Sequence, residues 1–263
     1  MAEAAYTGPV RQMLEIGEPA YSRGFAWPEY RVYGLGPEHI PDLIRLATDQ
    51  ALICMPDNCD EPSSWGPVHA WRALGQLHAE AAVLPLLNLF HEVADNDWVI
   101  EEMPDVFAAI GPAAYPALTE YLLDKAHPDH SRMVAASCLM QLGLAYPEMR
   151  SVAVSVLAGQ LEGYAKNSPG VNGVLIANLL ELEAVDQTKL IQTVFTVGKV
   201  DRFIAGDWRD AKKRLKRAAD TAGNMPASQD GALKRTATGT PPDPSPNPRP
   251  ASQEPNTQPR QRA

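Results

Sequence analysis

The sequence predicts an all-α protein, an α-α superhelix (solenoid) of about five helix pairs with a disordered C-terminal tail. The first observation is a motif that occurs twice without a gap, at 35–43 and 110–118: an apolar residue, Gly-Pro, two further residues, then apolar-Pro-x-Leu. Looser copies place turns at positions 36, 78, 111, 143 and 183, and the spacing of 32 to 42 residues is the period of a two-helix repeat. Apolar residues also recur at helical spacing, and no alternating stretch is long enough for a sheet.

Each repeat is expected to form a helix, a short turn and a second helix. Residues 99–110 place apolar side chains on one stripe and carboxylates on the opposite side. Pro116 lies in the first turn of the next helix, where its missing N–H costs nothing. Because one pair cannot bury its apolar face alone, we expect neighbouring pairs to stack. The side chains expected to be buried are Val99, Met103, Val106, Phe107, Ile110, Leu118, Leu122, Leu123, Val134, Ala135, Cys138, Leu139, Leu142, Val152, Val156, Leu157, Leu161, Val174, Leu175, Leu179, Leu182, Leu190, Ile191, Val194 and Phe195.

The two ends of the chain differ from its centre. We divide the chain into an irregular N-terminal cap at 1–33, a repeat domain at 34–217 and a disordered Pro-rich basic tail at 218–263. The cap is rich in Gly, Pro and aromatic residues and is expected to cover the first repeat. A helix over about 207–219 carries Lys212, Lys213, Arg214, Lys216 and Arg217 and is expected to close the other end. Nine of the 24 prolines lie in the last 38 residues, a composition that cannot bury enough apolar surface to fold.

The net charge of −9 combines two parts of opposite sign. From residue 212 onward, ten Lys and Arg and four Asp and Glu give +6, which leaves −15 on the preceding part. So acidic a body repels phosphate backbones, and nucleic acid is expected as a partner only weakly through the tail. No apolar run reaches 18 residues and no signal-peptide pattern opens the chain, so we expect a cytoplasmic protein without a membrane span. Three cysteines are too few for a disulfide framework, which agrees with a reducing compartment.

The first candidate binding site is an acidic cluster with an indole beside it. The sequence Asp-Asn-Asp-Trp at 95–98 is followed by Glu101, Glu102 and Asp105 at helical spacing. On an exposed helix face, Trp98 and these carboxylates would hold a basic peptide or a cationic ligand through charge pairing and cation–π contact. The alternative is structural: Asp95 or Asp97 caps the helix, the glutamates favour its positive end, and Trp98 packs on the adjacent turn.

The second candidate is the segment 65–72, in which His69 and Trp71 face a groove beside a long acidic loop at 57–61. Long insertions in repeat arrays often lie on the binding face. In the alternative reading Trp71 is a large core residue. Metal sites at Cys54, Cys59 and His69, or at His127 and His130, lack the four convergent ligands that structural zinc requires, so no metal is assigned.

Several stretches resemble a known family. The segment 73–77, Ala-Leu-Gly-Gln-Leu, and the segment 83–87, Val-Leu-Pro-Leu-Leu, match the pattern of short HEAT-like repeats first recognised in phycobilisome lyases. The resemblance covers about 33–200. The segments 34–41 and 206–208 also resemble those that open and close the array in a group of bacterial HEAT-repeat proteins. The likeness implies a HEAT-like superhelix and says little about function, because this superhelix is a reusable binding surface.

We therefore expect a non-enzymatic protein-binding scaffold whose acidic, aromatic-containing surface recruits a basic segment of another protein. The alternative is a phycobilin-lyase-like enzyme that binds a tetrapyrrole. The sequence contains no phosphate-binding glycine loop, His-Glu-x-x-His helix, Gly-x-Ser-x-Gly elbow or dinucleotide fingerprint, so we assign no catalytic residue and no cofactor. The expected binding residues are Trp98, Glu101, Glu102, Asp105, Trp71 and His69.

Overall fold

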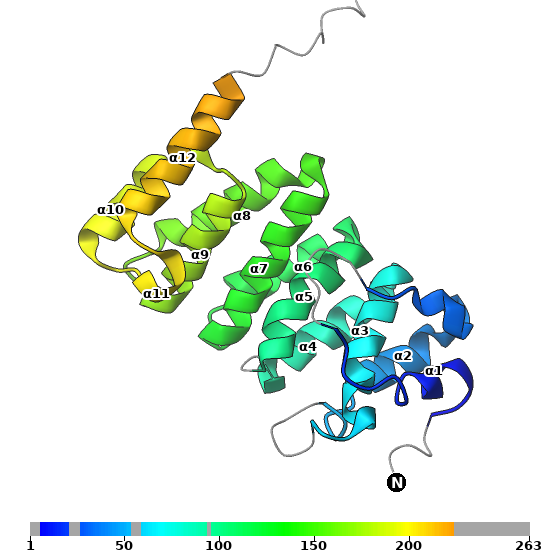
Figure 1. Ribbon diagram of the computed structural model, residues 1–263. Helices are drawn as coiled ribbons and strands as arrows, with labels where there is room; N and C mark the ends of the chain where they lie inside the picture. Colours follow the sequence, from blue (N-terminus) through cyan, green and yellow to red (C-terminus); the bar gives the residue numbers. More distant parts are fainter. Residues whose placement is uncertain (1–5, 21–26, 54–58, 94–95, 224–263) are drawn as a thin grey trace, which may run out of the picture. The chain divides into compact units, whose positions relative to one another are not determined.

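The computed structural model describes residues 6–20, 27–53, 59–93 and 96–223. All regular structure in these ranges is helical, which confirms the all-α prediction. None of these helices combines the length and apolar composition that a membrane crossing requires. The α-helices are α1 (Gly8–Gln12), α2 (Ile40–Ala47), α3 (Gly66–Gln76), α4 (Val83–Val93), α5 (Asp97–Ile110), α6 (Tyr115–Leu123), α7 (Asp129–Ala145), α8 (Arg150–Glu162), α9 (Pro169–Glu181), α10 (Thr188–Val197), α11 (Arg202–Ala205) and α12 (Trp208–Gly223) (Figure 1).

The helices fall into two alternating sets. We call α3, α5, α7 and α9 the first helices, and α2, α4, α6, α8 and α10 the second helices. A short 3₁₀ helix leads directly into each of the second helices. The first unit is incomplete, because a 3₁₀ helix at Tyr30–Tyr33 stands where a first helix would be. The connecting 3₁₀ helices are Pro37–His39, Glu80–Ala82, Pro112–Ala114, Pro147–Met149 and Val185–Gln187.

Three of the turns reverse the chain through a residue with positive φ. His78 and Glu183 adopt φ values of 50° and 51°, and Gly111 adopts 110°. At His78 the turn is closed by the N–H of Ala79, which donates to the carbonyl of Leu74 at 3.0 Å. This hydrogen bond satisfies a carbonyl that the end of α3 would otherwise leave without a partner. Positions 78, 111 and 183 therefore form the turns that the sequence repeat predicts.

The turn expected at position 143 lies three residues further along. Gly143 is buried inside α7, and the helix ends at Ala145. A Cβ atom on Gly143 would lie 3.0 Å from the Cβ of Ala153 and 3.0 Å from Cδ2 of Leu182. This glycine therefore permits close packing of α7 against its neighbours and does not reverse the chain, so the expectation of a turn there was wrong.

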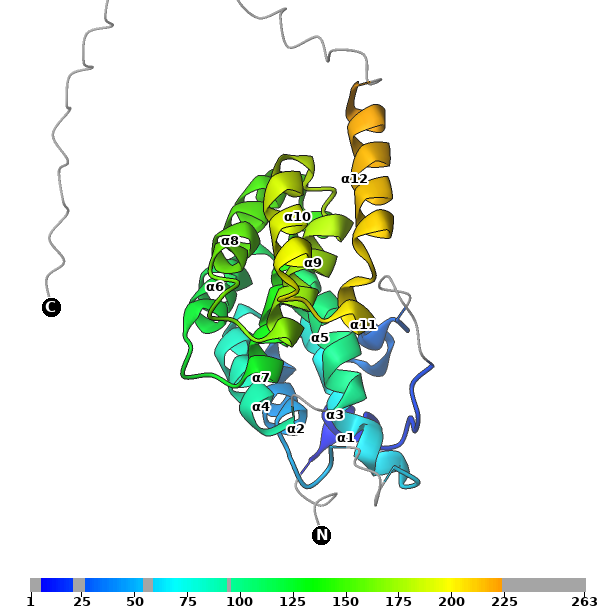
Figure 2. The same cartoon turned by 90° about the vertical axis from the view of Figure 1, so that its left-hand side faces the viewer.

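The helices pack in two rows (Figures 1 and 2). Each first helix contacts the next, from α3 through α5 and α7 to α9, and α9 contacts α11. Among the second helices, α2 contacts α4, α4 contacts α6, and α8 contacts α10. Between the rows, α7 packs against both α6 and α8. The first helices from α3 to α9 thus pack against one another in chain order.

The buried residues follow the predicted stripes closely. The five apolar residues predicted on α5 are all buried, and so are those on α7. Two predictions were wrong: Leu123 is 48% exposed and Val152 is 42% exposed. Both lie on second helices, where the outer face is solvated. Val156, Val174 and Leu190 are only partly buried.

The last helix begins at Trp208 and extends to Gly223. Residues 218–223 therefore belong to α12 rather than to the tail that we placed at 218–263. Ala211, Leu215 and Ala218 form its buried stripe, and the helix contacts α9 and α10. The predicted disorder of the tail concerns residues 224–263, which lie outside the described residues.

One polar contact joins each first helix to the next. Arg72 of α3 pairs with Glu102 of α5, with Nε to Oε2 at 2.9 Å. Continuing along the row, Gln141 Nε2 donates to Asp105 Oδ1 at 2.6 Å, Asn178 Nδ2 donates to Ser137 Oγ at 3.5 Å, and Arg214 Nη2 lies 2.9 Å from Glu181 Oε1. We call this series the polar ladder. It runs along the first helices from α3 to α9 and continues to α12.

Candidate functional site

The N-terminal arm, residues 6–20 and 27–33, lies along α3. Side chains of α3 hold it there by hydrogen bonds to main-chain carbonyls of the arm. His69 Nε2 lies 2.8 Å from the carbonyl oxygen of Gly17, and Arg72 Nη2 lies 3.3 Å from that of Ala20. Gln76 Nε2 donates to the carbonyl oxygen of Pro28 at 2.9 Å. The three α3 side chains are spaced three and four residues apart and therefore share one helix face. A row of side chains on a first helix thus hydrogen-bonds main-chain carbonyls of a non-helical part of the chain.

His69 is neutral and its tautomer follows from its partners. The Gly17 carbonyl can only accept, so Nε2 carries the proton and Nδ1 accepts from the Tyr30 hydroxyl at 2.7 Å. Burial lowers the pKa of His69 to about 4, and the nearby Arg72 charge acts in the same direction. Burial likewise raises the pKa of Tyr30 above its usual value. Both groups therefore stay uncharged near neutral pH and act as fixed hydrogen-bonding partners.

The ion pair beneath the arm is fully enclosed. Arg72 and Glu102 are 1% and 2% exposed, and the Trp27 ring lies 5.9 Å from the guanidinium carbon. Burial alone would lower the pKa of Arg72, but the hydrogen bonds and the charge of Glu102 outweigh it and raise the pKa. This pair fixes the arm, α3 and α5 to one another, and a charge left alone there would be costly.

Three of the six predicted binding residues are therefore not available to a partner. His69, Trp71 and Glu102 are at most 2% exposed, so the expectation that they form a binding surface was wrong. Trp71 follows the structural alternative, because its ring is in the core and its Nε1 donates to the Ala47 carbonyl at 2.7 Å. The arm covers His69 and the Arg72–Glu102 pair, whereas Trp71 is buried against α2.

The other three residues lie at the surface of α5. Glu101 is exposed, whereas Trp98 and Asp105 are half-buried. The Trp98 ring packs edge-on against Trp65 with 5.1 Å between centroids. Asn96, not a neighbouring aspartate, caps α5 and accepts the N–H of Trp98 at 2.9 Å. Asp95 lies outside the described residues. The expected acidic cluster thus reduces to Asp97, Glu101 and Asp105, each one helical turn from the next.

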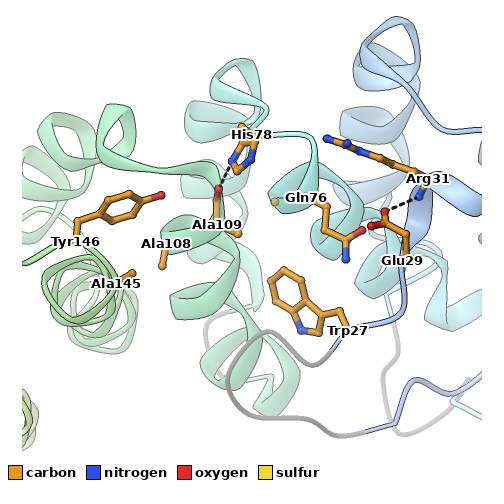
Figure 3. A pocket seen from close by; sticks show the side chains of 10 residues that line it. Trp27, Glu29, Arg31, Gln76, His78, Ala108, Ala109, Ala145 and Tyr146 are labelled. Atoms are coloured by element: carbon orange, nitrogen blue, oxygen red, sulfur yellow. Dashed lines mark hydrogen bonds between the residues drawn. The ribbon is translucent and has the colours of Figure 1, made fainter.

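A pocket of about 510 Å³ opens where three first helices end (Figure 3). Sequence reasoning did not identify it, because its residues come from four separate segments. Its walls contain the last turns of α3 and α5, the end of α7, and the arm. The residues that line it are Trp27, Glu29, Arg31, Gly75, Gln76, His78, Ala108, Ala109, Ala145 and Tyr146.

Carbonyl oxygens are available at this end of the helices. The carbonyl of Ala108 would normally bond the N–H four residues later, but that residue is Pro112, which has none. The carbonyl of Ala109 accepts from Nδ1 of His78 at 2.7 Å (Figure 3). Helix C-termini carry partial negative charge, so this side of the pocket favours hydrogen-bond donors and cations.

The remaining histidines and cysteines bear on metal and redox chemistry. No group of three or more His, Cys, Asp or Glu that fits a metal ion occurs in the part of the chain described. His127 stacks on Tyr121 with 3.8 Å between ring centroids, so it belongs to an aromatic contact. Cys138 is buried and free.

Comparisons with protein-family models, with curated proteins and with solved structures give no match for this chain. The functional argument therefore rests on the residues and geometry of the site itself.

Proposed function

We propose that this protein is a non-enzymatic scaffold, a HEAT-like α-solenoid that binds an extended segment of another protein along α5 and α7. The observation that carries the proposal is the arm on α3. There, His69, Arg72 and Gln76 hydrogen-bond main-chain carbonyls of a non-helical part of the chain. Because α5 and α7 continue the row of first helices, we expect a segment of another protein to bind beside the arm in a similar way.

The charge of this surface favours a basic segment. Glu101 is exposed on α5, and Asp105 follows one turn later with its carboxylate bonded to Gln141 of α7. The body as a whole is acidic, which speeds the encounter with a cationic partner at low salt. Main-chain hydrogen bonds would supply part of the affinity, and these carboxylates would select Lys or Arg.

A selection with short random peptides displayed on phage tests the proposal on the full chain. We expect enriched peptides to carry Lys or Arg and to bind less tightly as salt increases. A Glu101→Lys variant should lose these peptides. Glu120→Lys makes the same charge change on an exposed site of α6, in the row of second helices, and should retain them.

Two outcomes would contradict the proposal. Peptides that bind Glu101→Lys as well as the unchanged chain would place the site elsewhere. If instead no peptide is enriched and the purified chain shifts the visible absorption band of an added bilin or haem, the tetrapyrrole-binding alternative would replace it.

A further inference from the structure

The pocket at the ends of α3, α5 and α7 carries one charge of each sign. Glu29 and Arg31 both come from the arm, and Figure 3 shows their side chains reaching towards Gln76 and His78. Within the described ranges neither side chain forms an ion pair, although Oε1 of Glu29 accepts the backbone N–H of Arg31 at 3.1 Å. That hydrogen bond fixes the carboxylate at the rim. The pocket therefore offers a carboxylate and a guanidinium that are not neutralised by each other.

The pocket also has apolar lining residues, which are Trp27 of the arm, Ala108, Ala145 and the ring of Tyr146 (Figure 3). Gly75 has no side chain to fill the pocket. A Cβ atom on Gly75 would lie 3.2 Å from the Trp27 ring, so a larger residue would fill the space in front of the indole. The volume of this pocket is in the range of small-molecule sites, and its lining is about half polar and half apolar.

We propose that this pocket binds a free α-amino acid with an apolar side chain, as the zwitterion. The ammonium group would bind the Glu29 carboxylate and the carbonyl ends of the helices, and the carboxylate would bind Arg31. The side chain would lie against Trp27 and Tyr146. A ligand with a single charge would pair with only one of the two rim groups, the Glu29 carboxylate or the Arg31 guanidinium. The other group would then have no ion-pair partner in the pocket. This proposal is independent of the peptide-binding function.

The imidazole of His78 adds a further contact for the ammonium group. Its Nδ1 donates to the Ala109 carbonyl, so in the neutral ring Nε2 remains an acceptor. His78 holds a positive φ of 50°, which is uncommon outside glycine and keeps this side chain at the turn beside the pocket.

Calorimetry and thermal unfolding of the full chain with L-leucine, L-methionine and L-phenylalanine test the proposal. Two blocked analogues of each serve as probes: the N-acetyl form lacks the ammonium and the methyl ester lacks the carboxylate. We expect at least one free amino acid to bind and to raise the unfolding temperature, and its two analogues to bind about tenfold more weakly or not at all.

Variants locate the site. Glu29→Gln keeps the oxygen that accepts the Arg31 N–H, so the local turn should persist while the charge is lost. Glu29→Gln and Arg31→Gln should each weaken binding about tenfold. Glu120→Gln, on the exposed face of α6, should leave it unchanged.

Four results would overturn the proposal. Equal binding of the methyl ester would make this a site for a lone cation, and equal binding of the N-acetyl form would make it an anion site. Binding that survives both arm variants would place the ligand elsewhere. Absence of binding by all three amino acids would remove the proposal altogether.

Discussion

Acidification should loosen the contact between the arm and α3 through one side chain, His69. Its neutral ring is held between Tyr30 and the Gly17 carbonyl, and its pKa is lowered to about 4 in the folded chain. In the unfolded chain the pKa returns to about 6.5. Between these two values the unfolded chain binds more protons than the folded chain, so stability increases with pH in that window. The contribution is complete above pH 6.5 and is lost as the pH falls towards 4.

The size of the effect follows from this difference in pKa. A shift of about 2.5 pH units corresponds to about 3.4 kcal/mol once the pH is below both values. At about pH 5 the unfolded-state histidine is almost fully protonated and the folded one almost neutral, so about 2 kcal/mol is lost relative to about pH 7.5. A loss of this size is a large fraction of the stability of an ordinary domain.

Urea unfolding at both pH values, for the unchanged chain and for His69→Gln, measures the effect. Glutamine can still donate towards Gly17 and accept from Tyr30, but it does not titrate. The variant should be less stable at the higher pH and should lose about 2 kcal/mol less than the unchanged chain on acidification. Carboxylates titrate equally in both chains, so the difference isolates His69. Equal losses within about 0.5 kcal/mol would refute the reasoning.

Three further predictions test the packing: two concern substitutions, at Arg72 and Gly75, and one concerns the reactivity of Cys138. Arg72→Met should destabilise the fold by about 3–5 kcal/mol because it leaves the Glu102 carboxylate buried alone, and adding Glu102→Leu should recover most of that loss in urea unfolding. Gly75→Ala should cost about 1–3 kcal/mol by crowding α5 and the arm, whereas Gly159→Ala, which meets open space on α8, should be neutral or stabilising. Cys138 is fully buried with a raised pKa, so its thiol should react with Ellman's reagent only in denaturant; rapid reaction of the native chain would contradict its burial.

The helical units could be predicted because their boundaries depend on local residue types. Pro37, Pro112 and Pro147 each begin a 3₁₀ turn, and a proline fixes φ without help from distant residues. The apolar stripes are similarly local, since 3.6-residue periodicity determines which side chains share a face. The turn predicted at Gly143 was wrong because a glycine can serve two purposes: it can reverse the chain, or it can let a neighbouring helix pack closely.

The candidate site was harder to predict because it depends on contacts between distant segments. Gly17 and His69 are 52 residues apart, and no spacing rule connects a carbonyl in a Gly-Pro-rich arm to an imidazole on a helix. From the sequence alone, a charged residue such as Glu102 is expected to face solvent, because the sequence does not show that Arg72 lies beside it. The aromatic residues of the arm were the one available signal, and they indicated a cover over the first repeat without identifying what it covered.

The polar ladder has a consequence for how such an array can change. Its first three links differ chemically: a guanidinium with a carboxylate, a carboxylate with a carboxamide, and a carboxamide with a hydroxyl. The fourth, Arg214 with Glu181, again pairs a guanidinium with a carboxylate. Excising the pair α5–α6 would remove Glu102 and leave the buried Arg72 guanidinium without its carboxylate. The pairs are therefore not interchangeable modules, and duplication, deletion or shuffling would be penalised at each new junction. The side-chain contacts between neighbouring helices therefore favour one order of the helical pairs.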